Sequence, residues 1–262
     1  MKFDIRAYNE RGIKGKVRLN PIAPRMGPEI EYQRALRRML REVAKIVRED
    51  VIPAYTAEKR LTQDGPRDWL ASLAAMRSRL VGTADAMVGR VLATEAGRHT
   101  DAWQRSLKRT LGVDMGAIIR QEDLAGVLEI AAARNTGLIT SLADDTIKRI
   151  EQTVLRNAST GGSVKSLREQ LQNDLGVMDS RAKLIARDQV SKMNADLNRQ
   201  RHLQAGITEY EWQTSQDERV RPRHAELNGK TYKYSEPSGA EEGLPPGQPI
   251  LCRCVAIPVV TF

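Results

Sequence analysis

The sequence predicts an α+β protein with a mainly helical body and a small C-terminal β-rich module. Between residues 30 and 206, apolar residues recur at three- and four-residue steps, as they do on one face of an α-helix. After Gly206 the pattern alternates between polar and apolar residues, which is typical of half-buried strands. Only 4% of the residues are aromatic, which argues against a β-sandwich. We expect four segments: 1–29, 30–120, 121–206 and 207–262.

The first segment, residues 1–29, is expected to form an extended arm. Two alternating stretches, 2–8 and 16–19, are compatible with a hairpin. Three prolines between residues 21 and 28 exclude a regular helix there. We expect the arm to contact a neighbouring chain or to lie loosely on its own body.

The next segment is expected to hold two helices. A basic amphipathic helix should end near Pro53, and Asp64-Gly65-Pro66 indicates a turn. The second helix should run to about Leu111, with a break or bend near Gly82 or the glycine that follows it. A glycine directly after Leu111 is in the usual place for a helix C-terminus.

Capping residues divide the third segment into further helices. Asp123 and Ser163 are each expected to cap a helix start. Gly176 should end the helix after Ser163, and Ser180 should cap a long one that ends at Gly206.

The last segment predicts strands at 209–214, 231–234 and 255–260. Leu227-Asn228-Gly229-Lys230 contains an Asn-Gly turn, a strong hairpin signal. Residues 235–249 are expected to form a loop rich in Pro, Gly and Glu.

Positive charge is concentrated in the first half of the chain. Residues 1–120 hold 24 Lys and Arg against 14 Asp and Glu, whereas residues 121–262 hold 18 against 19. This asymmetry favours contact between the first half and a polyanion such as DNA, with a solvated helix surface as the alternative. The candidate DNA contacts are five cations of the first helix: Arg34, Arg37, Arg38, Arg41 and Lys45.

Two cysteines in 262 residues exclude a disulfide scaffold and fit a reducing compartment. No run of about 18 apolar residues is present, so no membrane span is expected. The N-terminus lacks the apolar core of a signal peptide.

The densest group of polar functional side chains lies between Asp217 and His224, with Cys252-Arg253-Cys254 further on. One interpretation is a metal site of His224, Cys252 and Cys254, with Asp217 as a fourth ligand. Thiolate and imidazole ligands suit zinc, although Cys-x-Cys is not the usual zinc-knuckle spacing. Side chains alternate along a strand, so both sulfurs should point to one face. We expect free thiols or a shared metal there, because a disulfide between these cysteines would be strained.

Two other interpretations remain open. The cluster fits a catalytic Cys–His pair or a His-centred nuclease, although no second ligand set for a nuclease is visible. It also fits a structural network in which His224 bonds to backbone and arginines pair with acids. The arginines are Arg219, Arg221 and Arg253, and the acids are Asp217, Glu218 and Glu226. A distance below about 4 Å from His224 to the nearer sulfur would keep the metal interpretation open, and a much longer one would favour the structural network.

Weaker candidates have simpler explanations. His99 is expected on a helix surface, and His202 near a helix end, where the dipole favours it. The carboxylates of Asp144 and Asp145 are expected to be solvated.

An ordered set of motifs also resembles a known family. The set is Trp212, Asp217-Glu218-Arg219-Val220-Arg221-Pro222-Arg223-His224, Leu227-Asn228-Gly229-Lys230, Pro245-Pro246-Gly247 and Cys252-Arg253-Cys254. Upstream, Gly162-Ser163, Ser180-Arg181-Ala182 and Ile185-Ala186-Arg187-Asp188 are similar to the same family's helical half. The family is that of the phage Mu F-like head morphogenesis proteins, the minor head proteins of tailed phages. Asp188-Gln189 departs from it, because relatives often carry Thr-Glu there.

The resemblance implies a structural component of the procapsid and virion, present in few copies near the portal vertex. It implies head assembly and genome delivery, with the portal protein or capsid interior as partner, and no enzymatic activity. The protein would be found in the virion head, and in the host cytoplasm during assembly. Some relatives carry a toxin domain after the Cys-x-Cys strand. Because this sequence stops at Phe262, shortly after that strand, no toxin domain is expected in it. The family-motif residues are Trp212, Asp217, Arg219, Arg221, His224, Gly229, Cys252 and Cys254.

No cofactor is implied by the resemblance, and zinc is the one candidate from the residues themselves. Near packaged DNA, the basic half should bind phosphates without sequence preference. The alternative function is a metal-dependent enzyme acting on nucleic acid through Asp217, His224, Cys252 and Cys254.

Overall fold

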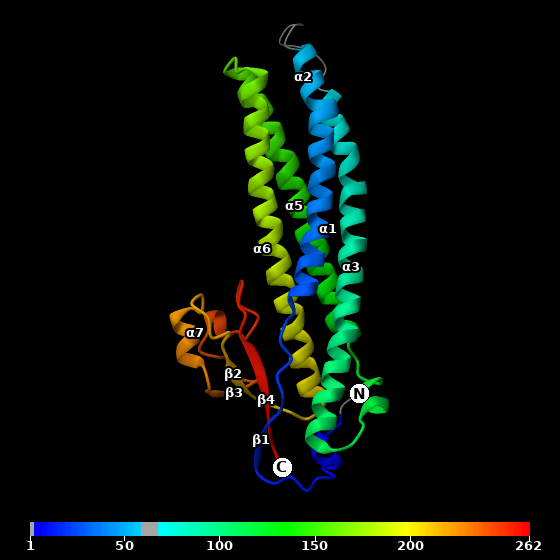
Figure 1. Ribbon diagram of the computed structural model, residues 1–262, viewed down its shortest axis with the longest axis vertical. Coiled ribbons are helices and arrows are strands. Elements are labelled where there is room, and N and C mark those ends of the chain that lie inside the picture. Colours follow the sequence, from blue (N-terminus) through cyan, green and yellow to red (C-terminus); the bar gives the residue numbers. More distant parts are fainter. Residues whose placement is uncertain (1–2, 59–67) are drawn as a thin grey trace. The chain divides into compact units, whose positions relative to one another are not determined.

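The computed structural model describes residues 3–58 and 68–262 (Figure 1). These residues form long helices and a four-stranded sheet, which confirms the predicted α+β class. They group into two compact units, each assembled from separate stretches of the chain. Unit 1 comprises Met1–Pro28, Leu92–Ala131 and Arg187–Phe262, and unit 2 comprises Glu29–Val91 and Ala132–Ala186. The turn expected at Asp64-Gly65-Pro66 lies outside the described residues.

Unit 2 is built from stretches of four long helices. These are α1 (Met26–Ile46), α3 (Asp68–Leu111), α5 (Ala125–Ser159) and α6 (Val164–Gln204). A π-helical turn (Val47–Val51) and α2 (Ile52–Glu58) follow α1. Polar side chains join these helices: Tyr32 of α1 bonds Asn135 of α5, and Arg37 of α1 pairs with Asp179 of α6.

The carboxylates expected to be solvated are instead used between helices of unit 2. Arg77 of α3 pairs with Asp144, and Arg181 of α6 pairs with Asp145. All four side chains are partly exposed, so solvent screens both pairs. The pairs therefore contribute more to the alignment of the helices than to their stability.

Three helix boundaries differ from the sequence prediction. The first helical stretch does not end at Pro53, because α2 continues to Glu58. The π-helical turn before Pro53 shifts the pattern of backbone hydrogen bonds, so the helix tolerates the missing N–H of this proline. Helix α3 continues through Gly82 without a break. Helix α6 also runs through Gly176 and Ser180, and the Ser180 hydroxyl donates to the Gly176 carbonyl instead of capping a new helix.

Other helix ends are confirmed. The Asp123 carboxylate accepts from the Ala125 N–H at the start of α5, and the Ser163 hydroxyl accepts from the Ser166 N–H at the start of α6. Gly206 ends α6 with φ of 75°, in the left-handed region that favours glycine.

The sheet of unit 1 is antiparallel, with strand order β1-β4-β2-β3. Its strands are β1 (Lys16–Arg18), β2 (Glu209–Gln213), β3 (Thr231–Lys233) and β4 (Val255–Thr261). Alternation in β2 buries Tyr210 and Trp212, as the sequence predicts. Between β2 and β3 the chain forms the short helix α7 (Pro222–Leu227). Leu227-Asn228-Gly229-Lys230 therefore makes a type II-like turn from a helix into β3, not a two-residue hairpin.

The N-terminal arm is an integral part of unit 1, which corrects two expectations. Ile5–Tyr8 forms a 3₁₀-helix, and β1 pairs with β4, so the arm forms no hairpin over the described residues 3–18. Ile5 and Leu19 are only 1% and 2% exposed, so the arm does not lie loosely. Helix α1 begins at Met26 and not after residue 29, because Pro28 is tolerated in a first helical turn.

Two further short helices were not anticipated, α4 (Gly116–Ile119) and a 3₁₀ turn at Glu241–Gly243. Among the described residues, none of the helices combines the length and apolar character needed to span a bilayer.

Candidate functional site

His224, Cys252 and Cys254 converge in unit 1. Pro222 occupies the first position of α7, which proline favours, and His224 is therefore the third residue of this helix. The cysteines lie in the extended stretch that leads into β4. Both Sγ atoms are 3.6 Å from Nδ1 of His224, and all three residues are buried. The predicted common face of the two sulfurs is confirmed, and both cysteines are free thiols.

The far side of the His224 ring is held by Glu241. Its Nε2 lies 2.7 Å from Oε2 of Glu241, and Nη1 of Arg221 lies 3.4 Å from the other oxygen of this carboxylate. The His224 hydrogen bond lowers the pKa of Glu241, so this group is ionised and acts only as an acceptor. Nε2 therefore donates to Glu241, and Nδ1 faces the two sulfurs. Trp212 packs edge-on against the ring at 5.3 Å between centroids.

The two thiols interact strongly. A hydrogen bond from Cys254 lowers the pKa of Cys252 to about 6, and the same bond together with burial raises the pKa of Cys254. The pair therefore favours one thiolate, on Cys252. A thiolate is the form of cysteine that acts as a nucleophile or metal ligand.

Loop residues 245–251 are anchored to α6, and this sets the position of Cys252. The Leu251 N–H donates to Oδ1 of Asp188 at 2.7 Å. The Gly247 N–H donates to Sγ of Cys252 at 3.4 Å. Gly247 has φ of 86°, and a Cβ there would lie 2.8 Å from that of Ala195, so no larger residue fits without movement.

A cavity of about 180 Å³ opens beside the three residues. Four arginines contribute to its lining: Arg187, Arg219, Arg221 and Arg253. This places positive charge around the exposed side of the His–Cys cluster.

The structure separates Asp217 from the cluster, which corrects its assignment as a fourth metal ligand. Its carboxylate pairs with Arg253 and accepts from the Arg219 N–H at 3.0 Å. The predicted arginine network is thus confirmed for Arg253 and Asp217. Arg221 bonds Glu241 and the Ile250 carbonyl instead of the acids named from the sequence. The predicted backbone bond of His224 is wrong, because this ring bonds a carboxylate.

Sequence reasoning missed Glu241, Asp188 as an anchor, and a buried polar network around Arg201. Arg201 and Glu122 form an ion pair at 3.1 Å with side chains 0% and 1% exposed. His99 was expected on the surface, yet it is 2% exposed and bonds Asn198 and Arg201. A charged residue at an inward position of α3 or α6 is the only sequence signal for this network.

The candidate DNA contacts on α1 divide into two kinds. Arg34, Arg38, Arg41 and Lys45 are exposed, whereas Arg37 is half-buried and pairs with Asp179. Lys45 lies 3.9 Å from Glu49 one turn further along.

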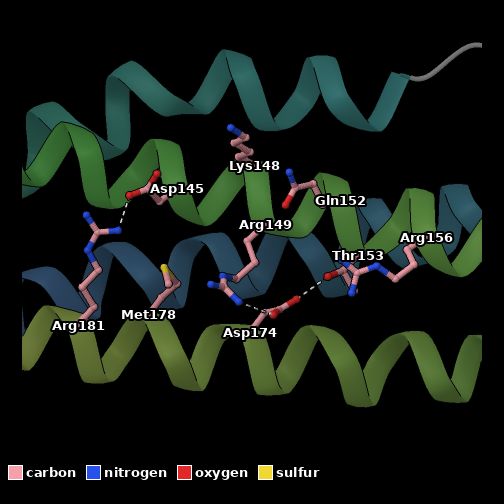
Figure 2. A pocket seen from close by; sticks show the side chains of 9 residues that line it. All are labelled: Asp145, Lys148, Arg149, Gln152, Thr153, Arg156, Asp174, Met178 and Arg181. Atoms are coloured by element: carbon pink, nitrogen blue, oxygen red, sulfur yellow. Dashed lines mark hydrogen bonds and ion pairs between the residues drawn. The ribbon is translucent and has the colours of Figure 1, made fainter.

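A shallow pocket of about 270 Å³ on unit 2 gathers further cations from α5 and α6 (Figure 2). Figure 2 shows Arg149 and Thr153 pointing toward Asp174, and Arg181 pointing toward Asp145. Lys148 and Arg156 are exposed beside them. No sequence motif pointed to this group, because the cations come from two separate helices.

Comparison with known proteins confirms the resemblance inferred from the sequence. Residues 148–257 match the family model described as phage Mu protein F like protein. An uncharacterized protein of Haemophilus influenzae is 36% identical over 168 residues, or 63% of this chain. The chain spans 37% of the length of that relative. No solved structure matches significantly. The matched segment contains Trp212, His224 and both cysteines, so the candidate site lies within the part of the chain that resembles this family.

Proposed function

We propose that the chain is a head morphogenesis protein of a tailed phage. Its role is structural: it joins the procapsid near the portal vertex, remains in the virion, contacts DNA and assists genome delivery. The observation that carries this proposal is the family match over residues 148–257, which coincides with the ordered motifs from Trp212 to Cys254. These motifs fold into one module around a buried His–Cys cluster.

The partners in this proposal are the portal protein or the capsid interior. The geometry gives no support to an enzyme built on Asp217, because that carboxylate is bound by Arg253.

The location can be tested by mass spectrometry of virions purified before and after DNA ejection. We expect the chain in filled heads, in few copies relative to the major capsid protein. Loss of the chain from emptied heads would support a part in genome delivery. Its absence from both procapsids and virions would refute the proposal.

The DNA contact is assigned to the exposed face of α1. Arg34, Arg38 and Arg41 lie on this face, and their charges are available to phosphates. Binding should be weak and independent of sequence, with Kd of roughly 10⁻⁴–10⁻⁶ M at physiological salt.

Replacing these three arginines with glutamine in the full chain tests the assignment. Each lost phosphate contact should reduce the slope of log K against log salt by about 0.9. A matched control replaces three exposed cations of α6, Lys165, Arg168 and Lys183, with glutamine. An equal loss of DNA affinity in both variants would show that α1 has no special part.

A further inference from the structure

Three buried side chains of ligand type meet at one point in unit 1. One donor atom from each of His224, Cys252 and Cys254 lies within 4.8 Å of the other two. We propose that these three residues bind one divalent, thiol-seeking metal ion of the zinc class, whose fourth coordination position faces the arginine-lined cavity.

The two nitrogen–sulfur distances fit this ion. Zinc lies about 2.3 Å from cysteine sulfur and about 2.0–2.1 Å from histidine nitrogen, with tetrahedral angles. These values place the nitrogen and each sulfur about 3.5–3.6 Å apart. Both observed distances from Nδ1 of His224 to Sγ are 3.6 Å.

Hydrogen bonding alone accounts less well for the arrangement. Nε2 of His224 faces Glu241 at 2.7 Å, so Nδ1 is the one ring nitrogen that faces the sulfurs. A single ring nitrogen makes one good hydrogen bond, yet two sulfurs lie at the same distance of 3.6 Å from it. A metal ion satisfies all three atoms at once.

The surroundings resemble those of a histidine metal ligand. Such histidines nearly always donate their second N–H to a carboxylate or carbonyl, which fixes the ring and its tautomer. Glu241 supplies this carboxylate, and Arg221 holds it from behind. The Gly247 N–H bonds the Cys252 sulfur, as an acceptor thiolate requires.

The fourth ligand comes from outside the cluster. Asp217 is taken by Arg253, and among the described residues the cluster holds three ligands. The cavity that touches all three is lined by four arginines. An ion with two thiolates has no net charge, so these arginines favour water, hydroxide or an acidic group at the open position.

The ion would act as a structural clamp. It would tie α7 and the loop before it, residues 217–221, to the stretch that enters β4. The joined residues are about 30 positions apart in the sequence.

Metal binding by the reduced, chelator-stripped full chain tests this proposal. We expect one zinc ion per chain, and intense thiolate-to-cobalt absorption when Co²⁺ replaces it. Cys252→Ser and Cys254→Ser should each remove most of that absorption. Glu241→Gln should keep it but weaken zinc binding by about 10-fold or more, since second ligand shells typically contribute 10–100-fold.

Asp217→Asn is the matched control and should bind zinc as the unaltered chain does. Loss of zinc binding in this variant would show that Asp217 is a ligand and that the fourth position is not open. A measurement on the unaltered chain avoids any folding defect: zinc should slow alkylation of both thiols. If zinc leaves alkylation unchanged and Co²⁺ gives no thiolate absorption, the proposal is wrong.

Discussion

Replacing His202 with glutamine should make the stability of the protein less sensitive to acid. His202 is 1% exposed, and its ring lies against Trp103 and bonds the Tyr234 hydroxyl at 2.7 Å. Burial lowers its pKa to about 3, and the neighbouring Arg201 charge adds to this effect. The ring is therefore neutral in the folded protein well above pH 3.

The size of the effect follows from proton linkage. Below its ordinary value of 6.5, the histidine of the unfolded chain binds a proton that the folded chain excludes until about pH 3. The contribution of His202 to the free energy of unfolding is therefore greatest above pH 6.5 and falls by about 1.4 kcal/mol per pH unit below it. By pH 5, His202 alone should cost about 2 kcal/mol. Burial also lowers the pKa of His99, so its contribution has the same sign.

Urea unfolding followed by tryptophan fluorescence at pH 5.0, 6.5 and 7.5 measures this dependence. The loss of stability between pH 7.5 and pH 5 should be smaller in His202→Gln by about 2 kcal/mol, whatever its stability at neutral pH. Tyr234→Phe is the control, because it removes the hydrogen bond but keeps the imidazole. Parallel pH curves for the unaltered chain and His202→Gln would refute the argument.

Three further changes test other parts of unit 1. Glu122→Gln leaves the fully buried Arg201 charge without its carboxylate and should reduce the free energy of unfolding by about 3–5 kcal/mol in urea titrations. Gly247→Ala should reduce the free energy of unfolding by about 1–3 kcal/mol and so lower the melting temperature, because Gly247 has a positive φ and a new Cβ would meet Ala195. An unchanged melting temperature would mean that the loop moves freely. Leu19→Ala should cost about 2–5 kcal/mol and speed proteolysis of the arm, unless the arm is loosely held.

The sequence predicted regular elements well and their interruptions poorly. Alternation located β2, the strand predicted at 255–260 is present as β4, and Asp123 marked a true helix start. Ser180 looked like a second start because its hydroxyl is suited to a cap. In the structure that hydroxyl bonds within α6, and packing of the helix outweighs the roughly 1 kcal/mol that a mid-helix glycine costs. Packing partners distant in sequence decide such cases, and local patterns do not contain them.

The same limit applies to the site. Period-two alternation was enough to bring Cys252 and Cys254 to one face, and the strand order then placed them beside His224. Glu241 was not predictable, because it reaches His224 from an irregular loop. The residue after it, Glu242, has φ of 56°, which the sequence does not signal. Arg201 was not singled out for a different reason: a charged residue is assigned to solvent unless its partner is known.

The segment that matches the phage family is not by itself a folding unit. Residues 148–257 contain β2, β3 and only the first three residues of β4, and β4 also pairs with β1, which lies outside the match. The core beneath the sheet includes Ile5, Leu19 and Trp103, again outside it. The arm and the end of α3 are therefore needed to hold the strand that follows Cys254. A metal clamp at His224 would act on the other end of that strand, so the two ends of β4 are held by different means.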